Sequence, residues 1–168
     1  MIELEIPAVK VLQESNNLGK YLIEPLLRGW GNTIGNSLRR VLLSSIPSYA
    51  IHGVIIDGVY HQFETINGVV QSVLEICLNL KKVRLKPIGQ PDNIPFSYKI
   101  TVSDKEVLKA GDLVRLSGMK EFEVVNPDLV ICEMDKGTTL KMEFFVSKGF
   151  GYLPADYFRE SIQLMGFI

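Results

Sequence analysis

The feature that most constrains this chain is an amphipathic helix, predicted within residues 28–45, with apolar side chains on two opposite faces. At about 100° per residue, one arc collects aliphatic residues in the i, i+4, i+7, i+8 pattern of a helix face; they are Ile34, Leu38, Val41 and Leu42. Leu43 points the other way, between Arg39 and Arg40. A single exposed leucine is common, but a leucine flanked by two arginines indicates a second docking surface.

Local signals set the ends of this helix and predict what packs on it. The two glycines of 29–31 form a turn, Asn32 or Thr33 is the predicted N-cap, and Pro47 follows the C-terminus. Gly35 lies inside the helix, where glycine costs about 1 kcal/mol relative to alanine. What it allows is the close approach of another backbone, so Gly35 favours packing of helix on helix.

The segment before the helix is too small to cover it. Residues 2–27 alternate apolar and polar side chains and predict two strands, the second at 20–24 and ending at Pro25. Because a two-stranded sheet is only marginally stable, we expect it not to shield the helix alone. A second copy of the helix, related by a two-fold axis, is the simplest completion.

From Ala50 onward the pattern predicts a mostly β unit. A hairpin is predicted from 51–56 and 59–63 around the Asp57–Gly58 turn. A helix is predicted over 69–81, and the face opposite its apolar arc carries Gln71, Ser72, Glu75 and Asn79. Residues 89–95 read as a loop. Further strands are predicted at 82–86, 96–102, 113–116, 122–125, 129–133 and 139–146, with a hairpin turn at 135–137 before the last.

Composition excludes several classes of function. The 168 residues are 46% hydrophobic and 22% charged, the balance of a soluble globular protein, with a net charge of −1 that does not favour nucleic-acid binding by this chain alone. No signal peptide and no apolar run of membrane-spanning length is found. Cys77 and Cys132 lie in apolar patterns and are expected to be buried thiols, which predicts the cytoplasm or an organelle of similar chemistry.

No catalytic, metal or cofactor site is predicted. His52 and His61 flank the Asp57–Gly58 turn, but two histidines without a third ligand make a poor metal site. The glycine-rich turn at 29–35 enters a helix, where phosphate can bind. It lacks the P-loop lysine, and Trp30 would occupy the space that a phosphate needs.

The chain resembles the N-terminal domain of the bacterial-type DNA-directed RNA polymerase alpha subunit over essentially its whole length. The segments that carry the resemblance are 24–26, 28–45, 56–59 with His61, 68–69, 75–76, 78–81, 130–132 and 149–154. The family usually has phenylalanine at Trp30 and glycine at Ser48. It also has an Arg-Gly-Arg-Gly-Tyr segment where this chain has Lys148 to Tyr152, so that Phe150 replaces an arginine.

The resemblance implies a non-catalytic subunit that dimerises and nucleates assembly by binding the beta and beta-prime subunits, which hold the catalytic machinery. Carried over by position, the dimer interface would be Trp30, Ile34, Leu38, Val41 and Leu42, and the large-subunit contact would be Arg39, Arg40, Leu43, Glu75 and Lys81. The subunit would contribute to nucleotidyltransferase activity only within the complex, reach DNA only through it, bind no cofactor itself and contact no membrane. The source would be bacterial or plastid-like.

The predicted fold class is α+β: a small dimerisation subdomain of strands and one amphipathic helix, with an inserted mostly-β subdomain carrying a second helix. Residues 1–47 would form the first part of the dimerisation subdomain, and 48–155 would form the inserted subdomain. At 156–168 the chain would begin to return to the dimerisation subdomain. In the family, more strands, a second dimerisation helix and a DNA-binding domain follow, so a truncated form is expected. The alternatives are a stand-alone dimeric protein-binding module, a non-functional remnant, or a small-molecule enzyme with a pocket.

Overall fold

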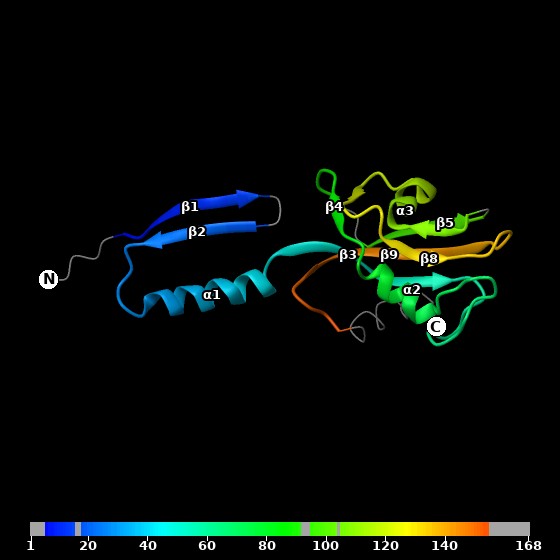
Figure 1. Cartoon of the computed structure of the whole chain (residues 1–168), viewed down its shortest axis with the longest axis horizontal. Coiled ribbons are helices and arrows are strands. Elements are labelled where there is room, and N and C mark those ends of the chain that lie inside the picture. Colours follow the sequence, from blue (N-terminus) through cyan, green and yellow to red (C-terminus); the bar gives the residue numbers. More distant parts are fainter. Residues whose placement is uncertain (1–5, 16–17, 92–94, 104, 155–168) are drawn as a thin grey trace. The chain divides into compact units, whose positions relative to one another are not determined.

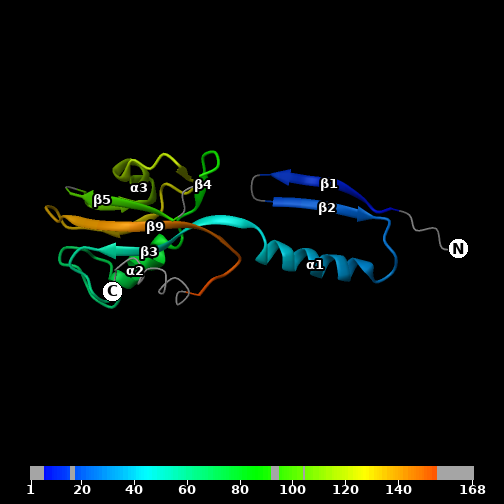
Figure 2. The same cartoon turned by 180° about the vertical axis from the view of Figure 1, so that it is seen from behind.

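The structure is a computed structural model that describes residues 6–15, 18–91, 95–103 and 105–154. The chain divides into two compact units, Met1–Ile46 and Pro47–Ile168, and each is described by itself. Both units combine strands with a helix (Figures 1 and 2). The predicted α+β class is therefore confirmed.

The first unit is an antiparallel hairpin followed by one long helix. Strands β1 (Ala8–Ser15) and β2 (Leu18–Glu24) pair with a bulge between Val11 and Gln13. Helix α1 spans Trp30–Ser44, so the predicted start after Asn32 or Thr33 is wrong. Gly29 adopts the left-handed conformation at φ 89°, and the Trp30 N–H donates to the Leu27 carbonyl at 3.1 Å. The chain thus turns into the helix earlier, at a position that favours glycine.

The second unit is built on a five-stranded antiparallel sheet in the order β5-β9-β3-β4-β7, with a separate β6–β8 pair. Its strands are β3 (Pro47–Ile56), β4 (Leu85–Pro87), β5 (Phe96–Val102), β6 (Val107–Lys109), β7 (Phe122–Val124), β8 (Val130–Glu133) and β9 (Leu140–Phe150), and its helices are α2 (Val73–Leu80) and α3 (Ala110–Ser117). One apolar core joins these elements, with Phe144, Phe122 and Ile76 among its fully buried side chains.

The predicted 51–63 hairpin is wrong. The Asp57–Gly58 turn is present, but strand β3 pairs with β9 along its whole length, and residues 59–63 form no strand. Local hydrogen bonds curl that segment instead: the Val59 N–H donates to the Ile56 carbonyl at 3.1 Å, and the Glu64 N–H donates to the His61 carbonyl at 3.1 Å. His52 and His61 therefore do not oppose each other across two strands.

Helix α2 begins later than predicted because Ser72 caps it. The Ser72 hydroxyl accepts the Glu75 N–H at 3.4 Å, and the Glu75 carboxylate accepts the Ser72 N–H at 2.9 Å, a capping box. The residues before the cap pair with the end of β8, since Val69 bridges Met134 and the Val70 N–H donates to the Glu133 carbonyl at 2.9 Å.

The polar face of α2 is only partly exposed. The Gln71 side-chain oxygen accepts the Glu133 N–H at 2.6 Å, and the Asn79 amide donates to the Ile131 carbonyl at 3.0 Å. Both polar side chains therefore anchor the helix and its entry to strand β8.

Residues 113–116 form part of helix α3 and not the predicted strand. Leu113 is fully buried while Leu116 stays partly exposed, and Gly118 ends the helix in the left-handed conformation at φ 68°. The start of α3 approaches the following loop closely, since the Gly111 N–H donates to the Pro127 carbonyl at 3.0 Å. A Cβ on Gly111 would lie 3.0 Å from that of Pro127.

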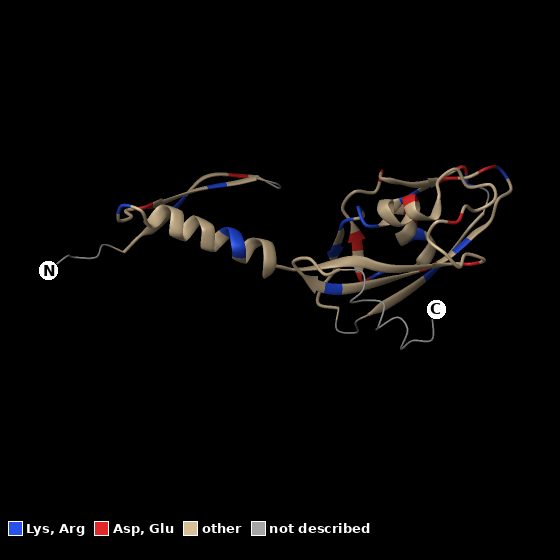
Figure 3. Cartoon of the chain, turned by 90° about the horizontal axis from the view of Figure 1, so that it is seen from below, with Lys and Arg blue, Asp and Glu red and all other residues tan. Residues whose placement is uncertain are grey.

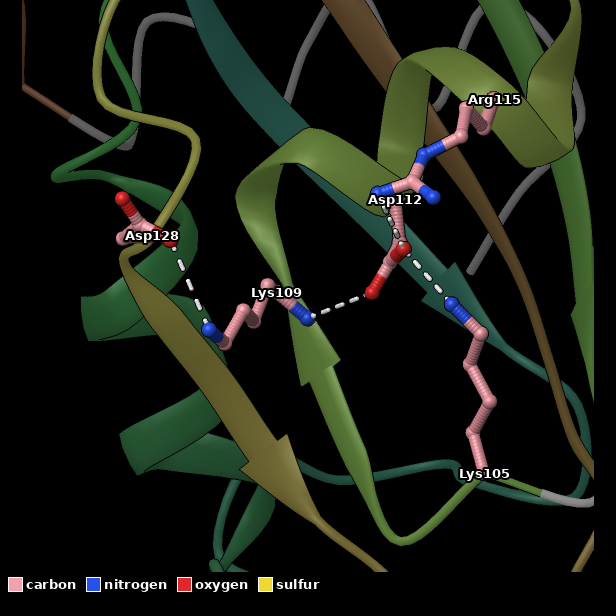
Figure 4. A network of polar contacts seen from close by, with 5 residues as sticks. All are labelled: Lys105, Lys109, Asp112, Arg115 and Asp128. Atoms are coloured by element: carbon pink, nitrogen blue, oxygen red, sulfur yellow. Dashed lines mark hydrogen bonds and ion pairs between the residues drawn. The ribbon is translucent and has the colours of Figure 1, made fainter.

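A buried carboxylate organises the start of α3 (Figure 4). Asp112 accepts the backbone N–H of Lys109 at 3.1 Å and the Lys105 ammonium at 2.6 Å, with the Arg115 guanidinium 3.4 Å away. The Lys109 ammonium pairs with the exposed Asp128 at 3.5 Å. Burial raises the pKa of Asp112, but these hydrogen bonds and positive charges outweigh it and hold that pKa below its usual range.

The remaining strands follow the prediction in part. Strand β5 has the predicted bounds, and β7, β8 and β9 begin within one residue of theirs. The turn at 135–137 is present, but it joins β8 to β9 without pairing them, so the predicted hairpin there is wrong. Strand β4 begins only at Leu85, because the N–H groups of Lys82 and Val83 bond back to the end of α2, while the Asn126 side chain bonds the Lys82 carbonyl and the Arg84 N–H.

Candidate protein-docking surface

The predicted dimer-interface residues lie along one helix and are largely uncovered. Helix α1 contains no buried residue; Ile34 is half-buried, while the exposed fraction runs from 47% at Leu38 to 61% at Leu42. Trp30 and Val41 are likewise about half exposed. A monomer rarely leaves so many large apolar side chains in water on one helix, so this face is a candidate docking surface.

The hairpin of the same unit adds to that surface. In β1 and β2 the apolar side chains of Val9, Val11, Leu18 and Tyr21 are exposed. Among the described residues of the unit none is buried, and only Ile23, Leu26 and Ile34 are half-buried. The prediction did not include these strand residues, although their alternation with polar neighbours was the available signal.

The opposite face of α1 carries the two arginines and Leu43. Figure 3 shows the two arginines as the blue part of helix α1, which contains no other lysine or arginine. Leu43 is 68% exposed, and within the described parts of the chain neither arginine has a carboxylate partner. This surface combines an exposed apolar side chain with free positive charge.

Gly35 leaves an open strip on the helix. Apart from the chain neighbours and the nearby backbone of the helix itself, no heavy atom of the described residues lies within 4 Å of the position that a Cβ on Gly31 or Gly35 would take. The unit's own hairpin therefore makes no close backbone approach there. The predicted approach of a second helix backbone stays a prediction.

The two other predicted contact residues lie on α2 in the second unit. Glu75 and Lys81 are both exposed. Glu75 already serves the helix through its capping box, and Lys81 is the C-terminal cap residue. Any loss of partner binding on substitution of Glu75 must therefore be separated from a loss of helix stability.

Neither cysteine forms a disulfide. Cys132 is fully buried and Cys77 is half-buried. Burial raises the pKa of the Cys132 thiol to about 11 and also raises that of Cys77. Both thiols thus stay protonated at neutral pH, as expected of structural cysteines.

The described residues include no group of three or more histidine, cysteine or acidic side chains placed to hold a metal ion. Nor does any helix in those ranges have the length and apolarity needed to cross a membrane.

Comparison with known proteins identifies the family. The family model described as the RNA polymerase Rpb3/RpoA insert domain matches residues 54–168. The chain belongs to this family. The resemblance to the bacterial-type RNA polymerase alpha subunit is thereby confirmed, and it extends beyond the insert domain to the first unit.

Curated relatives carry the name DNA-directed RNA polymerase subunit alpha. The relative from Carboxydothermus hydrogenoformans is 39% identical over 168 residues, covering 100% of this chain and 52% of its own length. Those from Porphyromonas gingivalis and Symbiobacterium thermophilum are 46% and 45% identical, covering 88% and 93% of this chain. The chain spans about half the length of these relatives.

Proposed function

We propose that this chain is a non-catalytic alpha subunit of DNA-directed RNA polymerase that dimerises and nucleates assembly by binding the beta and beta-prime subunits. Family membership and the names of the relatives support a role in transcription. The observation that carries the assembly role is the uncovered first unit, in which no described residue is buried. A catalytic role in the chain itself is not proposed, and the chemistry belongs to the large subunits.

The dimer would form through the apolar face of α1. Burying a leucine or valine side chain is worth about 1.5–3 kcal/mol, so two copies of a stripe that includes Leu38, Val41 and Leu42 supply a substantial driving force. A two-fold axis places the same residues on both sides of the interface. The open strip at Gly35 allows the two helix backbones to approach closely.

The large subunits would bind the other face of α1. Arg39 and Arg40 provide charge, and Leu43 provides an apolar anchor, the combination found at protein interfaces. Because Leu43 points away from the stripe, dimerisation leaves it accessible. Glu75 and Lys81 would form a further large-subunit contact on the second unit. The free thiols fit a reducing compartment, the cytoplasm or a plastid-like organelle.

The dimer is tested by Leu38→Asp. A carboxylate in the seam would be buried without a partner, so we expect the variant to be monomeric at concentrations where the native chain is dimeric. Light scattering coupled to gel filtration measures the mass directly. Leu43→Asp, on the opposite face, is the matched control and should remain dimeric. A native chain that stays monomeric at high concentration would contradict the proposed dimer.

Capture of the beta subunit is tested by Arg40→Ala. Truncating a charged interface side chain typically costs about 1–3 kcal/mol of binding free energy, so we expect the binding to weaken roughly fivefold or more in a pull-down with purified beta subunit. Arg28→Ala, an exposed arginine outside the helix, is the control and should bind normally. Unchanged capture by Arg40→Ala would instead favour a stand-alone dimeric binding module.

A further inference from the structure

The turn before α2 contains an asparagine that is followed by glycine. Asn67 precedes Gly68, and each other asparagine in the sequence is followed by a residue that has a side chain. The missing side chain matters because it lets the backbone of residue 68 approach other atoms closely. At this dipeptide the asparagine side chain and the next backbone nitrogen therefore meet with the least steric hindrance.

The turn leaves both of these groups free to react. It is closed by the Val69 N–H, which donates to the Ile66 carbonyl at 3.0 Å, and the Gly68 N–H takes no part in that bond. Asn67 is exposed, and in the parts of the chain that the structure describes neither its side chain nor the Gly68 N–H makes a hydrogen bond. Neither group therefore has to break a hydrogen bond within the described chain before they meet.

Two other asparagines of the same unit are held in place. The Asn79 amide donates to the Ile131 carbonyl at 3.0 Å, and the Asn126 amide donates to the Lys82 carbonyl at 3.0 Å. Asn126 is also followed by Pro127, whose nitrogen carries no hydrogen. These two side chains are internal controls for any reaction at Asn67.

We propose that Asn67 is a site of spontaneous deamidation in the folded chain. The Gly68 nitrogen attacks Cγ of Asn67, and a succinimide ring closes as the bond from Cγ to the side-chain nitrogen breaks. That nitrogen leaves as ammonia, with its own hydrogens and the proton lost by Gly68. Water then opens the ring. Attack at the side-chain carbonyl gives aspartate, and attack at the backbone carbonyl gives isoaspartate, in which the main chain runs through the former side chain.

Isoaspartate disturbs the entry to α2, because it lengthens the backbone in a segment anchored to the end of β8. The Asp135 N–H donates to the Gly68 carbonyl at 2.8 Å, and the Val70 N–H donates to the Glu133 carbonyl at 2.9 Å. The space beside Gly68 is already filled, since a Cβ there would overlap the Thr138 hydroxyl. An extra backbone carbon at this point therefore displaces these hydrogen bonds, whereas aspartate adds only a charge.

The site is tested by incubating the full chain in mildly alkaline buffer, once folded and once in guanidinium chloride, and locating each lost amide by tandem mass spectrometry. In the folded chain Asn67 should lose its amide before Asn79 and Asn126 do. Its rate should lie within about tenfold of that in the unfolded chain, a difference of ~1.4 kcal/mol in the barrier. Global unfolding cannot supply such a rate, because the unfolded form is orders of magnitude rarer than the folded one.

Asn67→Gln is the matched control variant. It keeps an amide at the exposed position, but its longer side chain cannot close the succinimide ring, so residue 67 should stay unmodified over the same time. The proposal is overturned if Asn67 in the folded native chain loses ammonia more than about tenfold more slowly than in the unfolded chain. Loss of the amide at Asn79 or Asn126 before Asn67 would overturn it as well. Neither outcome bears on the proposed function, which does not involve Asn67.

A second measurement tests the effect on α2. The isoaspartate product is separated by chromatography and identified by labelling with an isoaspartyl carboxyl methyltransferase. Asn67→Asp carries the same added charge on a normal backbone, so it isolates the effect of the extra carbon. The isoaspartate form should unfold at a lower urea concentration than Asn67→Asp, with the midpoint of Asn67→Asp close to that of the native chain. Equal midpoints for the isoaspartate form and Asn67→Asp would overturn the proposed effect on α2.

Discussion

At the scale of single residues, Asp112 is the one charged residue that is buried in the described parts of the chain. Its carboxylate is nearly buried, accepts a backbone N–H at the start of α3 and faces two cations. We expect Asp112→Ala to lower the free energy of unfolding by about 2 kcal/mol, because it removes a helix cap and a charge-assisted hydrogen bond. Urea unfolding measures the loss.

Asp128 provides the control for that measurement. Its side chain is 93% exposed and pairs with Lys109 at 3.5 Å, so Asp128→Ala should change the free energy of unfolding by less than about 0.5 kcal/mol. The contribution of Asp112 should also depend on pH. Its folded pKa lies below the unfolded value of about 3.9, so the stabilisation is complete above that value and is lost as the pH falls through the folded pKa. Equal losses in the two variants would contradict this account.

At the scale of elements, the capping box of α2 must be separated from its proposed role in binding. We expect Ser72→Ala and Glu75→Ala each to lower the free energy of unfolding by about 1 kcal/mol, since each removes one half of the reciprocal cap. Thermal unfolding and capture of the beta subunit should be measured on both. If Glu75 contacts the partner, Glu75→Ala should weaken capture of the beta subunit more than Ser72→Ala does. If the two variants weaken capture equally, Glu75 acts only through the stability of the helix.

An element could be predicted from the sequence where a local pattern determines it, and could not where pairing with a distant strand determines it. Helix α1 and strand β5 follow from periodicity, because their apolar residues recur over seven or more positions. Helix α3 was missed because its eight residues are too few to show a helical period, although Asp112 and Gly118 are capping signals. The 51–63 hairpin failed because β3 pairs with β9, some 90 residues later in the chain, and no local pattern reports such a pairing.

The site was predictable to a different extent. The two faces of α1 follow from the sequence, because Leu43 and the stripe are separated by helix geometry alone. How exposed these two faces are depends on what the β1–β2 hairpin covers, and only the structure shows that. Alternation of apolar and basic residues over 82–86 was visible in the sequence, but the hydrogen bonds that Asn126, more than 40 residues away, makes to Lys82 and Arg84 were not.

At the scale of the whole molecule, the two units differ in where their stability resides. The second has a closed apolar core that includes Phe122 and Phe144, whereas the described part of the first has no buried residue. Local stability follows burial, so amides of β3 and β9 should be protected from hydrogen exchange at every concentration. Amides of α1 should exchange rapidly in dilute solution and become protected as the concentration rises, because association stabilises only the folded form. Leu38→Asp should abolish that concentration dependence while leaving β9 protected. Strong protection of α1 in the dilute monomer would show that the unit is stable by itself and would remove the physical reason for a second copy.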